Sequence, residues 1–388
     1  MNRFYFDHNA TTPLRPEVLQ TLAPALAEVY GNASSIHYYG QIAKQRLEMA
    51  RRQLAGLLKC DPREVVFVSG GTEADNLAIF GIARQNESAR RHAITTSIEH
   101  PAVLSAFAQL EREGVDVTYA RVGSDGIVDP NEIRRAIRPD TVLISVMHAN
   151  NEIGTMQPIE EIAAIAKDAG VAFHSDGVQA AGKIPIDAKA LGVDLYSISG
   201  HKIYAPKGIG ALYVRNGITV SKLLHGGRHE RDRRPGTENV PGAMALGCAA
   251  ELSERDAVSE NRRIAALRDR LEQGIVDRAP AVGINGARDS RVPNTTNLHF
   301  DGIEGEAMVI SLDLKGFAVS SGSACSSGAV EPSHVLLAMG LSRELARSSL
   351  RFSLGRDNTE AQVDALIEAV AESAAHLRKI SPTYTARA

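Results

Sequence analysis

Lys202 is the side chain of this sequence best placed for covalent chemistry. It follows residues 195–201, which predict a strand that ends in a turn, and it precedes a proline- and glycine-rich run, 206–210. Lysine is usually a solvated surface charge, but this position is not expected on an exposed face. A buried lysine amine has a depressed pKa, which suits Schiff-base formation with an aldehyde and the transfer of protons.

A carboxylate and an amide follow a second apolar run upstream of this lysine. Residues 171–175 lead directly into Asp176, and Gln179 comes three positions later. The carboxylate could simply cap the next helix. It could instead pair with a protonated pyridine nitrogen, with Gln179 bonded to a ring hydroxyl. Lysine, aspartate and nearby polar donors are the parts that hold pyridoxal phosphate, so the sequence predicts this cofactor and an enzyme that transforms amino acids.

A glycine-rich turn supplies a candidate phosphate site. Residues 69–73 follow a predicted strand and open a predicted helix, where the free N–H groups of Gly71 and Thr72 suit a phosphate. The alternative is an ordinary turn in which Thr72 caps the helix. The P-loop lysine is missing, which disfavours a nucleoside triphosphate. Ser199 and His201, beside Lys202, would add further phosphate donors.

Two more side chains have both a structural and a chemical interpretation. His100 follows a predicted strand and could cap a helix or fill the core. It could also stack on a cofactor ring and exchange protons near neutral pH. Arg351 alternates with apolar residues on a short predicted strand. It could form a structural ion pair, or its planar fork could bind an amino-acid carboxylate.

The three cysteines differ in their surroundings. Cys325 lies in a run of serines and glycines, 320–328, with little apolar to pack against, whereas Cys60 and Cys248 lie in helical or apolar surroundings and are interpreted as structural. A lone cysteine is most often a small buried hydrophobe. Here, weak order is expected around Ser321 to Gly328, and an exposed thiol is a nucleophile or redox candidate. An odd, widely spaced set predicts neither a disulfide framework nor a zinc site.

Composition and charge exclude several classes of protein. The chain has 388 residues, 44% hydrophobic and 23% charged, with a formal net charge of −3. Nothing in that balance indicates nucleic acid or an anionic membrane as a partner. A transmembrane run of about 18 apolar residues is missing, and Asp7 interrupts the N-terminus before a secretory apolar region forms. With this cysteine usage, a cytoplasmic setting is expected.

The order of predicted elements indicates an α/β fold with two domains. Between residues 64 and 214, apolar strands alternate with helical patterns, which predicts a mostly parallel sheet covered by helices on both faces. The expected strands are 65–69, 93–96, 115–120, 141–147, 171–175, 195–199 and 210–214, and the expected helices include 76–84, 101–113 and 159–169. A charged helix over 261–275 begins a mixed region that ends in a helix near 359–378. We expect a large domain over 14–255 and a small one from 1–13 and 256–388.

In open α/β sheets, ligands gather at the carboxyl ends of the strands. Asp176, Lys202, Asn150 and the Gly70–Gly71–Thr72 turn all follow such ends. We therefore expect them to meet at one edge of the sheet.

Motifs spread over nearly the whole chain resemble those of class I cysteine desulfurases of the NifS/IscS type, and in particular the NifS form associated with nitrogen fixation. Each motif alone is weak, but the set is specific. The matching segments are 7–12, 31–35, 70–74, 99–101, 149–155, 200–202, 236–239, 320–327, 331–334 and 351–354.

The resemblance implies a fold-type I pyridoxal phosphate enzyme with a seven-stranded sheet that works as a homodimer. It implies conversion of L-cysteine to L-alanine, with the sulfur left as a persulfide on Cys325 and passed to an iron–sulfur scaffold or another acceptor protein. Cys325, Lys202 and His100 are the implied catalytic residues. No resident metal is expected, although Cys325 is a candidate transient iron–sulfur ligand. The implied cofactor contacts are Gly71, Thr72, His100, Asn150, Asp176, Gln179, Ser199, His201 and Lys202, with Thr237 from the partner subunit. The implied substrate contacts are Asn9, Asn150 and Arg351.

The chain departs from the family pattern without losing a chemical group that the reaction needs. His8 stands where asparagine is usual, Ala33 where proline is usual, and Pro235 where a small residue is usual. Ser175 and Gly177 replace the commoner threonine and alanine around Asp176.

Three other functions would use a related site. An aminotransferase would not need the Cys325 thiol. A selenocysteine lyase is not distinguished by the sequence, since selenium and sulfur differ little in geometry. A non-catalytic sulfur carrier would not need every type of cofactor contact.

Overall fold

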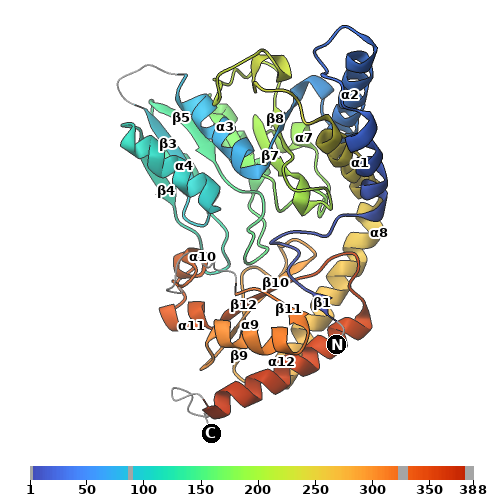
Figure 1. Cartoon of the computed structure of the whole chain (residues 1–388). Helices are drawn as coiled ribbons and strands as arrows, with labels where there is room; N and C mark the ends of the chain where they lie inside the picture. Colours follow the sequence, from blue (N-terminus) through green and yellow to red (C-terminus); the bar gives the residue numbers. More distant parts are fainter. Residues whose placement is uncertain (1–2, 86–90, 322–330, 381–388) are drawn as a thin grey trace.

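A seven-stranded sheet forms the upper part of the molecule (Figure 1). The computed structural model describes residues 3–85, 91–321 and 331–380. In spatial order the strands are β2 (Val65–Val68), β8 (Gly210–Val214), β7 (Leu195–Ser199), β6 (Ala172–Asp176), β5 (Thr141–Ser145), β3 (His92–Thr96) and β4 (Asp116–Ala120). Strand β8 is antiparallel to both of its neighbours, and the other neighbours pair in parallel. The prediction of a mostly parallel seven-stranded sheet is confirmed.

The length of a connection explains why one strand of this sheet runs antiparallel, and burial explains the composition of three of its strands. The short connection between β7 and β8, residues 200–209, holds no crossover helix, so β8 returns antiparallel. Strands β2, β7 and β8 are buried on both faces. Accordingly β2 and β8 carry no charged residue and are almost wholly apolar, while β7 also buries Ser197 and Ser199. The predicted strand bounds agree with the observed ones to within two residues.

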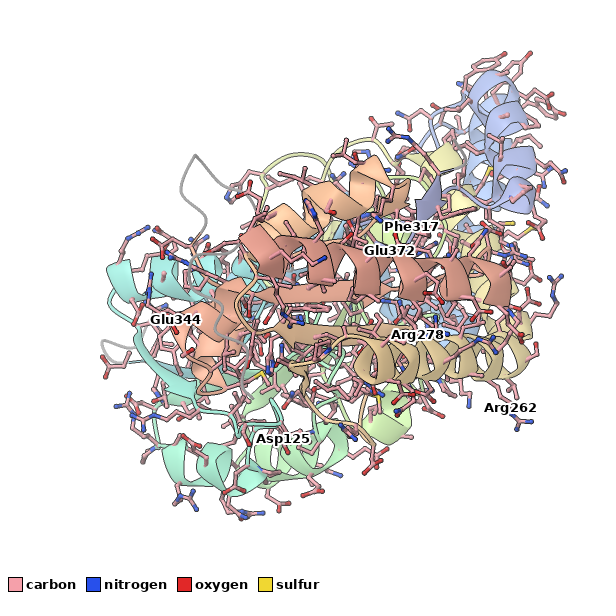
Figure 2. The ribbon with its side chains drawn as sticks, turned by 90° about the horizontal axis from the view of Figure 1, so that it is seen from below. Asp125, Arg262, Arg278, Phe317, Glu344 and Glu372 are labelled. Atoms are coloured by element: carbon pink, nitrogen blue, oxygen red, sulfur yellow. The ribbon has the colours of Figure 1, made fainter. Side chains whose placement is uncertain are left out.

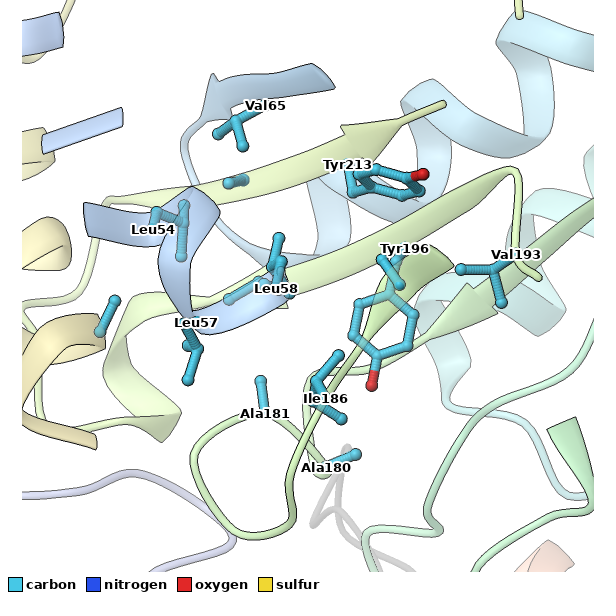
Figure 3. Close-up of a cluster of buried hydrophobic side chains, with 14 of the residues drawn as sticks. Leu54, Leu57, Leu58, Val65, Ala180, Ala181, Ile186, Val193, Tyr196 and Tyr213 are labelled. Carbon is cyan, nitrogen blue, oxygen red and sulfur yellow. The ribbon is translucent and has the colours of Figure 1, made fainter. Parts of the chain in front are cut away.

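Helices cover both faces of the sheet. Val65 and Phe67 point into an apolar cluster with α1, α2, α6 and α8, while Val66 and Val68 point into a second cluster with α3 and α4. Figure 3 shows part of the first cluster, where leucines of α2 face the strands that carry Tyr196. The helices of this part are α1 (Pro16–Glu28), α2 (Tyr38–Leu58), α3 (Gly71–Ala83), α4 (Pro101–Arg112), α5 (Pro130–Ala136), α6 (Ile159–Asp168), α7 (Ala188–Leu191) and α8 (Val240–Arg278).

Helix α8 is the main correction to the predicted elements. The predicted span of 261–275 is wrong, because the helix has 39 residues and starts at Val240. Its first half is rich in alanine and glycine, so it carries little amphipathic signal. Close packing on α2 forms this half: a Cβ atom added at Gly247 would lie 2.7 Å from Ala50 Cα. Helix α3 likewise begins at Gly71, earlier than the predicted residue 76.

The smaller part of the molecule lies below the sheet (Figure 1) and has a core of its own. Its strands are β1 (Phe4–Tyr5), β9 (Val282–Asn285), β10 (Thr295–Phe300), β11 (Phe317–Ala318) and β12 (Ser349–Ser353), and its helices are α9 (Gly305–Leu314), α10 (His334–Ala338), α11 (Arg343–Arg347) and α12 (Glu360–Ile380). Strands β12, β10 and β9 form an antiparallel sheet, and β1 pairs with β11 in parallel. In Figure 2, α12 with Glu372 and the end of α8 with Arg278 lie side by side.

The predicted domain division falls inside the continuous helix α8. The apolar clusters change along this helix, since Leu252 packs with the large sheet and Ile264 with the small core. Phe6 also packs in the small core, as expected for residues 1–13. The division at residue 255 stays a prediction.

The N-terminal segment joins the two parts across the region expected to hold the site. Phe6 N donates to Ala318 O (2.9 Å) in the small part, and Thr12 N donates to His201 O (2.9 Å) beside Lys202. Residues 7–11 therefore pass between the two cores. Among the helices of the described residues, none has the length and apolar character required to cross a membrane.

Candidate active site

Strands β6 and β7 bring the predicted aspartate and lysine to one edge of the sheet. The two strands are parallel neighbours, with Asp176 opposite Ser197. Strand β6 ends at Asp176, and β7 ends at Ser199 before a 3-10 turn, Gly200–Lys202. Both residues therefore lie at the carboxyl ends of neighbouring strands, and their meeting in one site stays a prediction.

Asp176 is a buried carboxylate that lacks a cationic partner. Its side chain is 5% exposed, and Oδ1 accepts from Val178 N at 2.9 Å. Within residues 3–85, 91–321 and 331–380 it forms no ion pair. Burial raises the pKa of Asp176, against the opposing effects of His100, the Val178 hydrogen bond and Lys202. A buried anion in this situation gains most from a cation bound at the site.

Lys202 has the depressed pKa that the sequence predicts. The pKa is lowered to about 8, first by burial and then by the charge of Arg351, while Asp176 and Asp7 act in the opposite direction. The amine donates to the carbonyl oxygens of Asn9 and, at 2.8 Å, Ala10. The N-terminal segment thus holds the amine in place, and these weak acceptors do not compete with covalent chemistry at the nitrogen.

Gln179 and Asn9 form a hydrogen-bonded layer beside Lys202. Gln179 Nε2 donates to Asn9 O (3.0 Å), the carbonyl that also accepts from Lys202. Asn9 Oδ1 accepts from Lys183 Nζ (2.9 Å) and from Asn294 Nδ2 (3.0 Å). Asn9 therefore fixes its neighbours, while its predicted contact with the substrate stays a prediction.

The glycine turn and the end of β7 lie together as a phosphate site requires. A Cβ atom added at Gly71 would lie 3.4 Å from Ser199 Cβ and 2.9 Å from Val178 Cγ2. The alternative in which Thr72 caps α3 is wrong: Gly70 occupies the N-cap position and makes no side-chain hydrogen bond there. The first amides of α3 are therefore left for a ligand.

His201 lies beside the N-terminal segment. Its Nδ1 hydrogen-bonds Thr11 Oγ1 at 3.1 Å. Its pKa is lowered to about 4, mainly by burial and then by Lys202 and Lys207, so the ring is neutral at pH 7.

His100 caps helix α4, as its structural interpretation proposed. Nδ1 accepts from Ala102 N at 3.1 Å, so the proton of the neutral ring lies on Nε2. The ring keeps an exposed surface, yet the surrounding protein desolvates it and lowers its pKa, against the attraction of Asp176. Capping leaves Nε2 available, so the structural and chemical roles are compatible.

Arg351 is anchored before any substrate arrives. Nη2 donates to Asp7 Oδ1 at 2.7 Å and Nη1 to Asn151 O at 2.9 Å. Nε is buried without a hydrogen-bond partner among the described residues. These two hydrogen bonds use two of the five N–H groups, so the guanidinium keeps donors that a carboxylate could take.

Cys325, the predicted nucleophile, lies outside the described residues, as does the predicted weakly ordered segment beyond Ser321. Ser320, five residues before Cys325 in the sequence, pairs its backbone with Arg351, whose N donates to Ser320 O at 2.7 Å. On the other side, His334 Nε2 donates to Glu99 O at 2.9 Å. The chain thus leaves the site region for Cys325 and returns to it.

The surroundings of Asn150, Thr237 and Cys60 agree with their predicted roles to different extents. The Asn150 side chain is buried and bonds the backbone: Nδ2 donates to Ile98 O (2.9 Å) and Oδ1 accepts from Glu152 N (2.8 Å). These contacts brace its loop, and its cofactor and substrate contacts stay predictions. Thr237 is exposed, so it remains available to a partner subunit. Burial raises the pKa of Cys60 to about 12, which suits a structural thiol.

Sequence reasoning missed two charged residues of the site. Asp7 pairs with Arg351 although 344 positions separate them, and Lys183 bonds Asn9 and Gln179. The one available signal for Lys183 was its place in the mostly apolar run 178–186. No sequence signal pairs Asp7 with Arg351, because that contact depends on the path of the N-terminal segment.

Comparison with known proteins agrees with this geometry. Residues 4–366 match the family described as Aminotransferase class-V. The chain is 50% identical over 378 residues to cysteine desulfurase IscS of Methanosarcina thermophila, covering 97% of this chain and 93% of that protein. It is 49% identical over 382 residues to a cysteine desulfurase of Nostoc sp., covering 98% and 95%. The chain belongs to the cysteine desulfurase family.

Solved structures give the same result. A NifS-like protein superposes with a TM-score of 0.91 at 36% identity, covering 97% of this chain and 100% of that one. A structure of SspA in complex with cysteine has a TM-score of 0.81 at 37% identity, covering 90% and 98%. The predicted family, the fold-type I architecture, the pyridoxal phosphate cofactor and the cysteine desulfurase class are confirmed.

The residues of this cysteine desulfurase fit pyridoxal phosphate. Asp176 is a buried anion without a cationic partner in the described chain, which suits a pyridinium nitrogen. The uncapped start of α3 at Gly71 suits the phosphate, and Ser199 lies next to it. The amine of Lys202 suits the aldehyde.

Proposed function

We propose that the chain converts L-cysteine to L-alanine and leaves the sulfur as a persulfide on Cys325. One observation carries the assignment of the acceptor thiol. Ser320, five residues before Cys325, pairs with Arg351, the residue we assign to the substrate carboxylate. The segment with the thiol therefore begins where the substrate would bind.

Lys202 and Arg351 provide the substrate's binding and proton transfer. Arg351 keeps unused N–H groups for the carboxylate, and Asp7 and Asn151 hold its guanidinium in a fixed orientation. With a pKa of about 8, roughly one Lys202 amine in ten is neutral at pH 7 and able to remove the Cα proton. Bound pyridoxal phosphate supplies the electron-accepting ring that stabilises charge at Cα.

Cys325 takes the sulfur by thiolate attack. The Cys325 thiolate attacks the sulfur of the substrate, a sulfur–sulfur bond forms and the carbon–sulfur bond breaks. The carbon fragment keeps the electron pair and takes up a proton to become alanine, so cysteine and one thiol give alanine and one persulfide. We assign the proton transfer to His100, whose Nε2 carries the proton of the neutral ring.

The functional unit we propose is a homodimer. Large apolar side chains are exposed over residues 19–39, with Ile36 93% and Tyr38 73% exposed. Tyr38 and Tyr30 both contact Tyr39, with ring centroids 5.5 and 5.2 Å apart, so the patch is continuous. A patch of this kind indicates a protein partner. A second copy would also allow Thr237, exposed on this chain, to reach the partner's phosphate site.

The acceptor we propose is an iron–sulfur scaffold protein in the cytoplasm. Nitrogenase maturation, general cluster assembly and other sulfur acceptors would use the same site. The support is the family membership and the motifs of the NifS form, together with a thiol segment bounded by the exposed Glu331. In this proposal Cys325 could also ligate a cluster transiently during transfer.

Two substitutions test these assignments. Lys202→Ala should abolish the visible absorbance of the bound cofactor, and an unchanged spectrum would show that another residue holds it. Cys325→Ala should keep that absorbance but lose the formation of alanine and persulfide from cysteine. Cys248→Ala, a half-buried cysteine of α8, is the matched control and should change neither. Normal turnover by Cys325→Ala would refute the persulfide mechanism.

A selenocysteine lyase is the second candidate. It would use the same cofactor residues, and the relatives named as cysteine desulfurases favour cysteine. The ratio of kcat/KM for the two substrates decides, and a ratio far in favour of selenocysteine would replace the proposal.

A further inference from the structure

Lys183 is a buried lysine without a role in the function proposed above. It is 9% exposed, and in the described part of the chain it forms no ion pair. Burial lowers its pKa well below the usual value, and Lys202 and Arg351 add to that effect. A buried lysine without an acid partner is costly, so its hydrogen bonds need an explanation.

Both hydrogen bonds of Lys183 go to predicted site residues. Nζ donates to Asn9 Oδ1 at 2.9 Å and to Gln179 Oε1. Gln179 Nε2 then donates to Asn9 O at 3.0 Å, and Lys202 donates to the same carbonyl oxygen. Lys183, Gln179, Lys202 and both the side chain and the backbone carbonyl of Asn9 thus form one hydrogen-bonded layer.

The chemistry of lysine fixes the orientation of the Gln179 amide. A protonated lysine is only a donor, and a neutral one still donates through two N–H groups, so the amide turns its oxygen toward Lys183. The NH₂ end then carries two N–H groups, of which one goes to Asn9 O. Without Lys183 the amide could turn over and present its oxygen to the ring hydroxyl. The hydroxyl would then have to donate, and the ring oxygen would lose the hydrogen bond it accepts from the amide N–H.

We propose that Lys183 is a positioning residue that holds Gln179 with its NH₂ group directed to the cofactor hydroxyl. Through its hydrogen bond to Asn9, Lys183 also holds the N-terminal segment whose carbonyl groups accept from the Lys202 amine. This inference rests on the proposed function, in which Gln179 contacts the cofactor ring.

Lys183→Met is the test substitution, because methionine keeps the apolar stem and removes the donor. Lys183 and Lys202 line a cavity of about 50 Å³, so the new side chain has room to adjust. Lys315→Met is the matched control: it also removes a lysine hydrogen bond, 2.6 Å to Glu372, but on the outside of the small part.

The readout is the pH midpoint of the visible absorbance change of the substrate-free holoenzyme. A hydrogen bond to the ring oxygen stabilises one protonation state, so its loss shifts the midpoint by about 0.5–1 pH unit. We expect this shift in Lys183→Met and in Gln179→Ala, no larger shift in the double variant, and none in Lys315→Met. Lys183→Gln, which keeps N–H donors, should restore the midpoint in part.

The results distinguish a wrong role for Lys183 from a wrong cofactor contact for Gln179. If Gln179→Ala shifts the midpoint and Lys183→Met does not, the positioning role is wrong and the function proposed above stands. If Gln179→Ala itself causes no shift, the contact assigned to Gln179 is wrong and this inference fails with it. Urea unfolding of the cofactor-free proteins provides the second measurement. A stability loss in Lys183→Met without a midpoint shift would reduce Lys183 to a purely structural role.

Discussion

Gly177, next to Asp176, and Tyr196, on the neighbouring strand β7, are matched in size. Gly177 stands where the family resemblance predicts alanine, directly after Asp176. A Cβ atom added at Gly177 would lie 2.0 Å from both Cε1 and Cζ of the Tyr196 ring. Carbon atoms in contact normally lie about 3.5–4.0 Å apart. The glycine is therefore required by the large side chain on the neighbouring strand, and Gly177→Ala is the perturbation that tests this reasoning.

The ring of Tyr196 has little freedom to move away. It is fully buried, and its hydroxyl hydrogen-bonds His148 Nδ1 at 2.8 Å. Gly177 N is also fixed, since it donates to Ser197 O at 3.1 Å. Overpacking of such a site costs about 1–3 kcal/mol. For a domain of this size, each kcal/mol lowers Tm by roughly 2–4 °C.

Thermal and urea unfolding of the cofactor-free protein measure this effect. Gly56→Ala is the control, because an alanine at this exposed position of α2 meets only the end of Glu254 at 3.2 Å and should stabilise by about 0.5–1 kcal/mol. Tyr196→Met should relieve the clash, so the double variant should be more stable than the sum of the single effects by about 0.5–3 kcal/mol. Unchanged stability of Gly177→Ala, or strict additivity, would refute the steric explanation.

Three further predictions follow from charged groups. The neutral fraction of the Lys202 amine grows as pH rises through its pKa of about 8, so uptake of pyridoxal phosphate by the cofactor-free protein should accelerate about tenfold between about pH 7 and pH 9. A rate that keeps rising in proportion toward pH 10.5 would contradict this. Arg51 and Glu230 form a fully buried ion pair at 2.7 Å, so Arg51→Met should cost about 3–5 kcal/mol in urea unfolding, and Arg51→Met with Glu230→Met should cost less. An Arg51→Met loss near zero would argue against the pair. Arg351→Met should raise KM for cysteine roughly 10–100-fold with a smaller change in kcat. An unchanged KM would show that the carboxylate binds elsewhere.

The sequence by itself determined the sheet and most of the assigned site. Apolar runs alternating with helical patterns predict parallel strands, and parallel strands place their carboxyl ends at one edge. Asp176 and Lys202 follow two such ends, so their placement at that edge depended on local sequence alone. Motif identity then indicated the family, because the motifs cover nearly the whole chain.

Only the tertiary structure shows which side chains hold the site residues in place through hydrogen bonds, ion pairs and packing. Lys183 bonds Asn9, Asp7 bonds Arg351, and the Tyr196 ring excludes a side chain at Gly177. These contacts join residues far apart in the chain, whereas propensity and periodicity describe neighbours only. Helix α8 was mispredicted for the same reason, since its first half is formed by packing against α2 and carries little periodic signal.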